Sequence, residues 1–356
     1  MNPPLILETM QAAYLIGPRT IELRPTQAPD CPPDGLLLEM KACGICGSDL
    51  RRWQEGPPSG VSHLIQGHEL AGVVTAIGRE TREYKPGDRL ALAPDIHCGL
   101  CYYCRRGLYN LCLDLKLLGI TPGLDGGFSE QVMIPRSVLT HGIVHWMPEG
   151  LSFAEGALAE TLSSVLASHA KCKTTLGETV VVMGAGPVGC LHTVVAQARG
   201  ARVILAEPLP ARRRGAEKFS PDAILDVTRQ DPVEAVRKLT NGIGADVVIC
   251  ANPVTATQTQ AVEIVRRGGK VVLFGGLPKA DPTTHLDGNR IHYGEIEVVG
   301  SFSYHPSFHE EALRVLSRKQ VRAELFITHT KSLSRISEGF EIAKSGEALK
   351  VMIEPD

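Results

Sequence analysis

Four cysteines lie close together in the stretch HCGLCYYCRRGLYNLC, with the spacing C-x2-C-x2-C-x7-C. They are Cys98, Cys101, Cys104 and Cys112. Four thiolates at such short spacing can close a tetrahedron around Zn²⁺ and leave no position for water or substrate, so the site would be structural. An iron–sulfur cluster also suits a C-x2-C-x2-C run, and four unligated thiols are a third possibility. We expect a structural zinc that holds a lobe at about residues 94–115.

A second cysteine pair, Cys43 and Cys46, lies in KACGICGSDLRRW. A C-x-x-C pair is compatible with half a zinc knuckle, with a thiol redox pair or with two buried small residues. The thioredoxin-like context that supports a redox pair is missing here. Spacing alone leaves the role of this pair open.

The sequence GAGPVG matches the dinucleotide-binding pattern G-x-G-x-x-G, between an expected strand and an expected helix. Gly184 permits the tight turn, Gly186 lets the backbone approach a pyrophosphate, and Gly189 lets helix and strand pack closely. The helix start, with Pro187 and Val188, would face the phosphates. The alternative is a glycine-rich turn without a nucleotide.

Glu207 ends the next expected strand, 18 residues after Gly189. A carboxylate at this place can accept hydrogen bonds from both ribose hydroxyls of NAD, and it would repel a 2′-phosphate. Arg212, Arg213 and Arg214 follow closely, and one of them could neutralise such a phosphate. We therefore predict NAD rather than NADP, with Arg212 as a further cofactor contact.

Two different patterns of apolar residues predict the elements that carry the cysteines and the glycine loop. Up to about residue 160, short apolar runs such as 36–40, 71–76 and 89–92 alternate with Gly/Pro turns, as in β-rich domains. From about residue 175, continuous apolar runs alternate with charged, helix-like segments such as 210–219 and 232–239. This pattern predicts right-handed βαβ units and a doubly wound parallel sheet. The runs are 179–184, 202–207, 245–250 and 270–276. The tail adds a helix at 309–319, then a second helix and a last strand at 349–353.

The bulk composition narrows the class of protein. A chain of 356 residues suits two domains, and a net charge of −2 gives no general attraction to nucleic acid or anionic membranes. The start, MNPPLILETM, lacks the pattern of a signal peptide, and the most membrane-like run, 179–198, is interrupted by glycines and a proline. Ten cysteines without a secretion signal favour a reducing compartment, so we expect a cytoplasmic protein with no membrane or nucleic-acid partner.

The ordered motifs resemble those of zinc-dependent medium-chain alcohol and polyol dehydrogenases. The motifs are GICGSD, GHELAG, KPGDR, the four-cysteine lobe and GAGPVG, and the resemblance runs from about Met10 to the carboxyl terminus. It implies an α/β protein with a GroES-like β-barrel catalytic domain and a Rossmann NAD-binding domain. The catalytic domain would be discontinuous, at 1–161 and 304–356, around a Rossmann domain at 162–303.

The same resemblance implies a catalytic zinc in addition to the structural one. Cys46 would bind it, whereas Cys43 has no ligand role in the pattern and would be a small core residue. His68 would be the second ligand and Glu160 the third. Glu69 matches an acid that binds the metal directly in some members and as an alternating ligand in others. The family motif around the third ligand usually has proline where this chain has Thr161.

Two further residues would assist, and one departs from the pattern. Ser48 occupies the proton-relay position beside the zinc, and Asp49 resembles the carboxylate that orients a zinc-bound histidine. Arg51 stands where many relatives have the histidine that ends the relay, and arginine cannot act as a base. Protons would then leave through water, or Arg51 would bind the cofactor or an anionic substrate group, or it would be a surface residue without a role. Trp53 could form an apolar wall for a sugar ring.

A Cys/His/Glu zinc should be a harder Lewis acid than a zinc with two cysteines and one histidine, which suits vicinal hydroxyls. We therefore expect hydride transfer from a secondary alcohol of a polyol, sugar alcohol or cyclitol to NAD⁺. Arg290 and His292 could face such a polyol or a phosphate, or lie at a subunit contact of a homodimer or homotetramer.

Several other functions remain alternatives. They are a threonine 3-dehydrogenase-like or simple alcohol dehydrogenase, a glutathione-dependent formaldehyde-type dehydrogenase, a non-catalytic NAD(P)-binding sensor or structural relative, and a zinc-ribbon nucleic-acid binder. Glu160 in place of cysteine argues against the formaldehyde type, and the net charge of −2 argues against the nucleic-acid binder.

Overall fold

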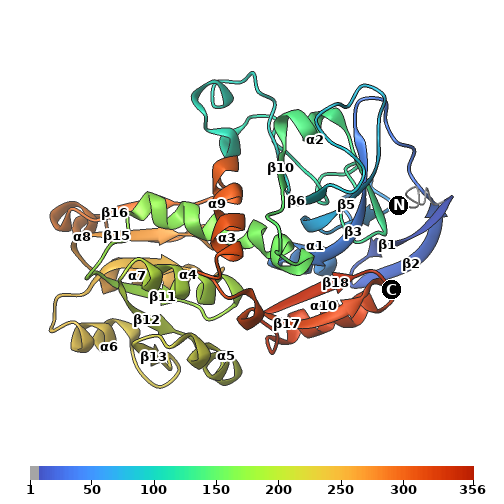
Figure 1. The fold of residues 1–356 in the computed structure, drawn as a ribbon. Coiled ribbons are helices and arrows are strands. Elements are labelled where there is room, and N and C mark those ends of the chain that lie inside the picture. Colours follow the sequence, from blue (N-terminus) through green and yellow to red (C-terminus); the bar gives the residue numbers. More distant parts are fainter. Residues whose placement is uncertain (1–7) are drawn as a thin grey trace. The chain divides into compact units, whose positions relative to one another are not determined.

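The computed structural model describes residues 8–356 and separates them into two compact units (Figure 1). The first unit holds the described residues up to Ser163 together with Tyr304–Asp356, and the second unit holds Ser164–Ser303. Most of the amino-terminal segment that lacks a signal-peptide pattern lies outside the described residues. Within residues 8–356, no helix has the length and apolar content needed to cross a membrane.

The second unit is built on a six-stranded parallel sheet with the order β13-β12-β11-β14-β15-β16. This order, with the first strand of this unit, β11, beside the fourth, β14, in the middle of the sheet, is that of a doubly wound dinucleotide-binding sheet. The prediction of a parallel α/β unit is therefore confirmed. The strands are β11 (Thr179–Met183), β12 (Arg202–Ala206), β13 (Ala223–Leu225), β14 (Ala245–Cys250), β15 (Val265–Leu273) and β16 (Glu297–Gly300).

Helices connect these strands. They are α4 (Pro187–Ala198), α5 (Pro210–Ala216), α6 (Pro232–Leu239), α7 (Thr255–Ile264) and α8 (Gly288–Gly294). The central strands are buried on both faces, which explains their continuous apolar runs. Strand β15 begins five residues before the predicted start at 270 and ends at Leu273, because Val265 already pairs with Ala245 of β14.

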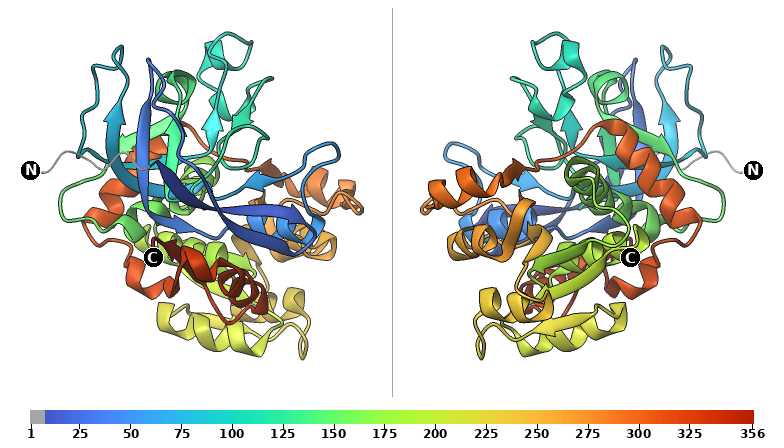
Figure 2. Two further views of the ribbon diagram at one scale, coloured as in Figure 1. Left: turned by 90° about the vertical axis from the view of Figure 1, so that its right-hand side faces the viewer. Right: turned by 90° about the vertical axis from the view of Figure 1, so that its left-hand side faces the viewer.

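The first unit is built mainly from antiparallel strands. One sheet has the order β10-β6-β5-β3-β18-β17, with β9 also paired to β3, and a second has the order β2-β1-β4. Strands β1 and β2 form a long antiparallel hairpin, drawn in dark blue in Figure 2. The strands are β1 (Thr9–Gly17), β2 (Thr20–Gln27), β3 (Leu36–Gly44), β4 (Leu64–Ile65), β5 (Glu69–Ile77), β6 (Arg89–Ala93), β9 (Gln131–Ile134), β10 (Ile143–Trp146), β17 (Ile327–Ser332) and β18 (Lys350–Glu354).

The helices described with these sheets are α1 (Gly47–Glu55), α2 (Arg136–His141), α9 (Pro306–Ser317), α10 (Ile336–Ser345) and the first half of α3 (Phe153–Cys172), which continues into the second unit after Ser163. Helix α9 begins three residues before the predicted start, because His305 caps its first turn through Nδ1, which accepts from the backbone N–H of Ser307. The prediction that Trp53 faces a sugar is wrong. Its side chain is 2% exposed and packs in the core, with its ring 5.5 Å from the ring of Phe340.

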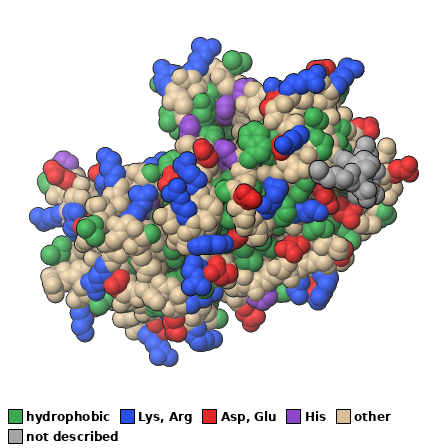
Figure 3. All heavy atoms as spheres, viewed as in Figure 1, with side chains coloured by type: hydrophobic (Ala, Val, Ile, Leu, Met, Phe, Trp, Pro, Cys, Tyr) green, Lys and Arg blue, Asp and Glu red, His purple; other side chains and the backbone are tan. Residues whose placement is uncertain are grey.

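The four-cysteine lobe projects from the first unit between the short paired strands β7 (Asp95–Ile96) and β8 (Lys116–Leu117). Tyr109 in this lobe stacks on His97 at 4.1 Å and on His305 at 5.1 Å between ring centroids. Farther along α9, Nδ1 of His309 lies 2.9 Å from Nδ1 of His145 in β10. Figure 3 shows histidine side chains, in purple, gathered beside the lobe.

Candidate active site

The turn between β3 and α1 holds Cys46. Cys46 is the N-cap residue of α1, and its backbone N–H donates to Oδ2 of Asp49 at 2.9 Å. Asp49 is 1% exposed, and Nε2 of Gln66 donates to its Oδ1 at 3.4 Å. A helix N-terminus supplies free N–H groups that stabilise a negative side chain, so this turn fixes both the thiol and the carboxylate.

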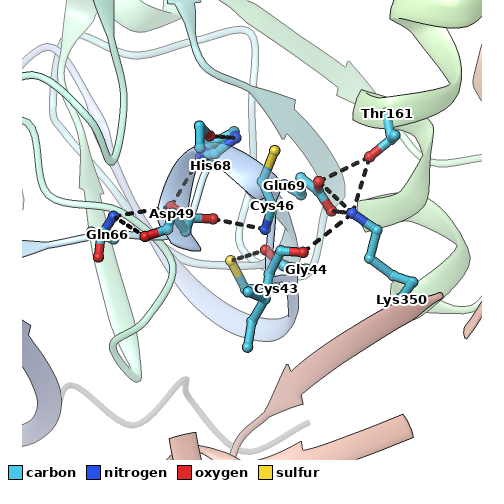
Figure 4. Close-up of polar contacts among 11 residues, drawn as sticks. Cys43, Gly44, Cys46, Asp49, Gln66, His68, Glu69, Thr161 and Lys350 are labelled. Atoms are coloured by element: carbon cyan, nitrogen blue, oxygen red, sulfur yellow. Dashed lines mark hydrogen bonds and ion pairs between the residues drawn. The ribbon is translucent and has the colours of Figure 1, made fainter. Parts of the chain in front are cut away.

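His68 enters from the start of β5 and faces this turn (Figure 4). The preceding residue, Gly67, has φ +100°, and a Cβ there would lie 2.7 Å from Sγ of Cys43. Nδ1 of His68 lies 3.4 Å from Oδ1 of Asp49, and its Nε2 lies 3.3 Å from Oγ of Ser48. The imidazole is therefore oriented by Asp49 on one side and faces Ser48 on the other.

The structure brings together Cys46, His68 and Glu69, whose potential ligand atoms lie within 4.8 Å of one another. Burial opposes a charged imidazole, but Asp49 and Cys46 outweigh it and raise the pKa of His68 well above its ordinary value. The cluster thus concentrates negative charge in a buried place, which is the setting that a bound cation neutralises. A thiol, an imidazole and a carboxylate are all zinc ligands, so the donor set fits Zn²⁺.

Glu69 is held by a buried ion pair that sequence reasoning missed. Nζ of Lys350, from the last strand β18, lies 2.6 and 2.7 Å from the two carboxylate oxygens of Glu69. The hydroxyl of Thr161 donates to Oε1 of Glu69 at 2.9 Å (Figure 4). The side chains of Glu69 and Lys350 are 0% and 3% exposed. Burial opposes the charge of Lys350, but Glu69 and Cys46 outweigh it, and its pKa is raised.

The structure explains the residue types at two positions beside the Glu69–Lys350 ion pair, Gly44 and Thr161. At Gly44, a Cβ would lie 2.0 Å from Oε2 of Glu69, so a larger side chain would displace the carboxylate. Thr161, which replaces the usual proline of the family motif, supplies a hydroxyl that proline lacks. This departure from the family pattern therefore adds a hydrogen bond to Glu69.

Glu160 lies in α3 and is not part of the three-residue group, although the charges of Glu69 and His68 act on it. Burial, and then the carboxylate of Glu69, raise the pKa of Glu160 to about 7. The phenol of Tyr304 donates to Oε1 of Glu160 at 3.3 Å. Burial first, and the charge of Glu160 second, raise the pKa of Tyr304 well above its ordinary value, so the phenol keeps its proton.

The lobe cysteines have the geometry of a single tetrahedral ion. The Sγ–Sγ distances are 3.5 Å between Cys101 and Cys104 and 4.0 Å for both Cys98–Cys104 and Cys101–Cys112. Zinc–sulfur bonds of about 2.3 Å in a tetrahedron require a separation of about 3.8 Å. A four-iron cluster, in which each thiolate binds a different iron, requires larger separations. All four cysteines are free, so disulfides do not explain the spacing.

The glycine loop of the second unit fits a dinucleotide. Gly184 has φ +115°, and a Cβ on Gly189 would lie 1.8 Å from the carbonyl oxygen of Gly184. A Cβ on Gly186, the N-cap residue of α4, would meet nothing within 4 Å, so this point of the loop is open for a ligand. Helix α4 then begins at Pro187, followed by Val188.

Glu207 lies directly beside this loop. Its Oε2 accepts from the backbone N–H of Ala185 at 2.7 Å, and its Oε1 accepts from that of Leu209 at 2.9 Å. Arg213 pairs with Asp226 at 2.6 Å, whereas Arg212 makes no ion pair within residues 8–356. Of the neighbouring arginines, Arg212 is therefore more available to a ligand than Arg213.

Comparisons with known proteins agree with both units. Residues 32–145 match the model of the alcohol dehydrogenase GroES-like domain, and residues 187–318 match the model of zinc-binding dehydrogenases. A sorbitol dehydrogenase of Bacillus subtilis is 33% identical over 98% of both chains. The chain belongs to the zinc-dependent medium-chain alcohol and polyol dehydrogenase family. The family predicted from the ordered motifs is thereby confirmed.

Other relatives of this dehydrogenase are named for different substrates, and one solved structure is bound to NADP. An L-idonate 5-dehydrogenase of Vitis vinifera is 33% identical and covers 97% of this chain and 94% of its own. The crystal structure of 2R,3R-butanediol dehydrogenase from Bacillus subtilis is 27% identical, with a TM-score of 0.86 over 98% of this chain and 100% of that one. A putative zinc-binding dehydrogenase from Sinorhizobium meliloti 1021, bound to NADP, is 30% identical, with a TM-score of 0.87 and the same coverage.

Several other residues predicted from the sequence lie outside the cluster of Cys46, His68 and Glu69. Cys43 is fully buried in the hydrophobic core. Arg51 is exposed. The guanidinium of Arg290 donates to the carbonyl oxygens of Val262 and Glu263, at the end of α7, and His292 is exposed beside Tyr293. The guanidinium of Arg290 therefore caps the carboxyl-terminal end of α7.

Lys350 and Tyr304 are the functional candidates that sequence reasoning missed. Lys350 leaves a signal in the sequence, because it is a charged residue directly before the apolar run Val351–Ile353 of strand β18. Tyr304 leaves none, since nothing in SFSYHP indicates that its phenol reaches a residue 144 positions earlier.

Proposed function

We propose that this dehydrogenase oxidises a secondary alcohol of a polyol to a ketone and reduces NAD⁺. The observation that carries the proposal is the mixed donor set of Cys46, His68 and Glu69, with the second carboxylate of Glu160 beside it. When bound, zinc supplies a Lewis acid that lowers the pKa of a substrate hydroxyl, and NAD⁺ accepts the hydride.

The residues of the chain then have separate tasks. Cys46, His68 and Glu160 would hold the metal, and Asp49 orients His68. Lys350 and Thr161 occupy both oxygens of Glu69, so Glu69 would be a ligand only after breaking a buried ion pair. We therefore infer that Glu160 is the resting carboxylate ligand and that Glu69 is the alternate one.

Oxidation of an alcohol releases one proton besides the hydride. The hydroxyl of Ser48 is placed to take this proton, since Oγ lies beside the metal-binding imidazole of His68. Arg51 is exposed and cannot act as a base, so water would carry the proton onward.

The donor set favours polyols over simple alcohols. A carboxylate in place of a second thiolate leaves the metal harder and more tolerant of an additional oxygen ligand. A substrate with hydroxyls on adjacent carbons can provide that oxygen. Such hydroxyls occur in the compounds for which three relatives are named: sorbitol, L-idonate and 2R,3R-butanediol.

NAD is the proposed cofactor because the carboxylate of Glu207 lies beside the glycine loop, where it would repel a 2′-phosphate. The relative that binds NADP makes this a point to test directly. Exchange of Glu207 for serine should shift the preference toward NADP.

The proposed polyol oxidation can be tested by measuring the formation of NADH or NADPH from a panel of alcohols as absorbance at 340 nm. The substrates would be sorbitol, galactitol, threitol, inositols, L-threonine and short monohydric alcohols, each with NAD⁺ or NADP⁺ and with or without a chelator. We expect chelator-sensitive turnover of a vicinal polyol with NAD⁺. The variant Glu160→Cys should gain activity on monohydric alcohols relative to polyols.

Turnover of threonine or monohydric alcohols alone would contradict the polyol proposal. Binding of NAD⁺ without turnover of any of these alcohols would contradict it as well.

We also propose that the enzyme is a cytoplasmic homodimer or homotetramer. All ten cysteines are free, which suits a reducing compartment. Strand β16 ends the parallel sheet and pairs on one side, with β15, among the described strands. Size-exclusion chromatography with light scattering measures the number of subunits, and a monomer at micromolar concentration would contradict the oligomer.

A further inference from the structure

Tyr304 is a buried tyrosine that makes a specific contact with one carboxylate of the site. Its side chain is 4% exposed, and its hydroxyl donates to Oε1 of Glu160 at 3.3 Å. Both residues belong to the first unit. A buried phenol almost always has a hydrogen-bond partner, and here the phenol interacts with the carboxylate of Glu160, an ionisable group of the site, and also with the hydroxyl of Ser163.

The two carboxylates of the site are held in different ways. Both oxygens of Glu69 are occupied, by Lys350 at 2.6 and 2.7 Å, and Thr161 adds a third contact. Glu160 has one hydrogen bond, from Tyr304 to Oε1, and no other is found within residues 8–356. The second oxygen of Glu160 is thus left for a ligand outside the protein.

The backbone on both sides of this hydrogen bond is fixed. Glu160 lies in the interior of the long helix α3. On the other side, Ser303 has φ +46°, a conformation that few non-glycine residues adopt, and His305 caps α9 and stacks on Tyr109. The side chain of Glu160 has three rotatable bonds, so a donor held in place is needed to select one of its rotamers.

We propose that Tyr304 is a positioning residue for Glu160, which holds Oε1 so that Oε2 is the oxygen offered to the catalytic metal. This inference rests on the proposed function, because it requires a metal ion at Cys46, His68 and Glu160. It deepens that function by naming a residue that decides how the third ligand is presented.

The experiment removes the hydroxyl with Tyr304→Phe and follows metal release to a chromogenic chelator, without substrate. The lobe provides an internal reference, because among residues 8–356 the hydroxyl of Tyr304 donates to Glu160 and makes no hydrogen bond with the four cysteines. Loss of a hydrogen-bonding partner of a metal ligand should speed release of the catalytic ion roughly 10- to 100-fold. Release from the lobe should be unchanged. The visible spectrum of a Co²⁺-substituted catalytic site should shift as well.

Tyr84→Phe is the matched control. Tyr84 is also buried in the first unit, at 8% exposure, but it stacks on Trp146 and has no contact with the carboxylates of the site. Both ions should leave this variant at wild-type rates. If Tyr304→Phe behaves like Tyr84→Phe and the Co²⁺ spectrum is unchanged, the inference is overturned.

Two further measurements distinguish a failure of the proposed function from a failure of the proposed role of Tyr304. A wild-type protein that binds one ion per chain, in the lobe, would contradict the proposed function itself. In a Glu160→Gln background, Tyr304→Phe should add little to metal release, because the two residues act as one unit. A full additional effect in that background would show that Tyr304 acts elsewhere, and it would overturn the inference even if the single variant is less stable.

Discussion

The four-cysteine lobe and the catalytic cluster are two proposed metal sites built on different physical plans. The lobe draws four identical ligand types from one short segment, and within residues 8–356 the hydrogen-bond partners of their sulfurs are each other and nearby backbone N–H groups. The cluster draws different ligand types from separate segments, and each has its own support. Asp49 faces His68, Lys350 pairs with Glu69, and Tyr304 holds Glu160.

This comparison shows that a structural ion and a catalytic ion need different support from the surrounding residues. An ion surrounded by four thiolates has no open position and needs little from the rest of the chain. An ion that must bind substrate keeps an open position, so its charge and geometry are set by surrounding groups. Helix α9 connects the two regions, because His305 at its start stacks on Tyr109 of the lobe and follows Tyr304.

The strongest test of the support around the cluster is Lys350→Met. It leaves the carboxylate of Glu69 buried without its partner, which should lower the free energy of unfolding by about 3–5 kcal/mol. Denaturant unfolding followed by tryptophan fluorescence measures this, since both tryptophans, Trp53 and Trp146, lie in the first unit.

Two variants serve as controls for Lys350→Met. The double variant Lys350→Met/Glu69→Gln should recover part of the loss. Lys331→Met, in the neighbouring strand, breaks a more exposed pair with Glu338 at 3.7 Å and should cost less than about 1 kcal/mol. Equal losses for Lys350→Met and Lys331→Met would contradict the special role of the buried pair.

The two metal sites should respond in opposite ways to loss of one cysteine. Cys46→Ala should lower kcat/KM on the order of 1,000-fold, because several kcal/mol of metal assistance are lost, with little change in the thermal midpoint. Cys104→Ala should lower the thermal midpoint and leave kcat/KM of the folded protein nearly unchanged. Zinc content should fall from two ions to one per chain in both. Similar kinetic losses in both variants would show that the lobe is not merely structural.

Acid should weaken the attachment of α9, the helix that connects the two regions. His309 is fully buried, and burial lowers its pKa to about 3, while burial also lowers the pKa of His145. An unfolded chain binds protons on histidine near pH 6.5, so below that pH the unfolded state takes up more protons than the folded one. The free energy of unfolding should therefore fall, by up to a few kcal/mol, as the pH decreases from about 6.5 toward 3.

His309→Phe should flatten this pH dependence, whereas exchange of the exposed His63, also in the first unit, for phenylalanine should not. The measurement is again denaturant unfolding followed by fluorescence, repeated across the pH range. An unchanged pH dependence in His309→Phe would assign the acid sensitivity to other groups.

The smallest effect should come from the stacking contact between the lobe and α9. Tyr109→Ala removes the ring that stacks on His97 and His305 and should cost about 0.5–1.5 kcal/mol for each contact. Tyr109→Phe keeps the ring and should behave as wild type. Thermal unfolding measures the difference, and metal release from the catalytic site should change by a few-fold at most. A large change in that release would mean that the two metal sites are coupled.

Local spacing in the sequence was enough to predict the lobe and the glycine loop. Cys98 to Cys112 and Gly184 to Gly189 each lie within one short segment, so chain connectivity alone brings their groups together. The parallel sheet was predicted for a related reason, because strands buried on both faces have continuous apolar runs. Trp53 was interpreted wrongly, since a single residue in a polar helix does not reveal which face packs against Phe340.

The sequence by itself thus determined the family, the parallel sheet and the residue types that can bind zinc. Only the tertiary structure decided how the two carboxylates of the site differ. Glu69 and Glu160 are both acids near a metal motif in the sequence, but Lys350 reaches one and Tyr304 the other. The physical reason is sequence distance: Lys350 is 281 residues from Glu69, and Tyr304 is 144 residues from Glu160. Contacts over such distances depend on strand pairing and helix packing, which no local pattern encodes.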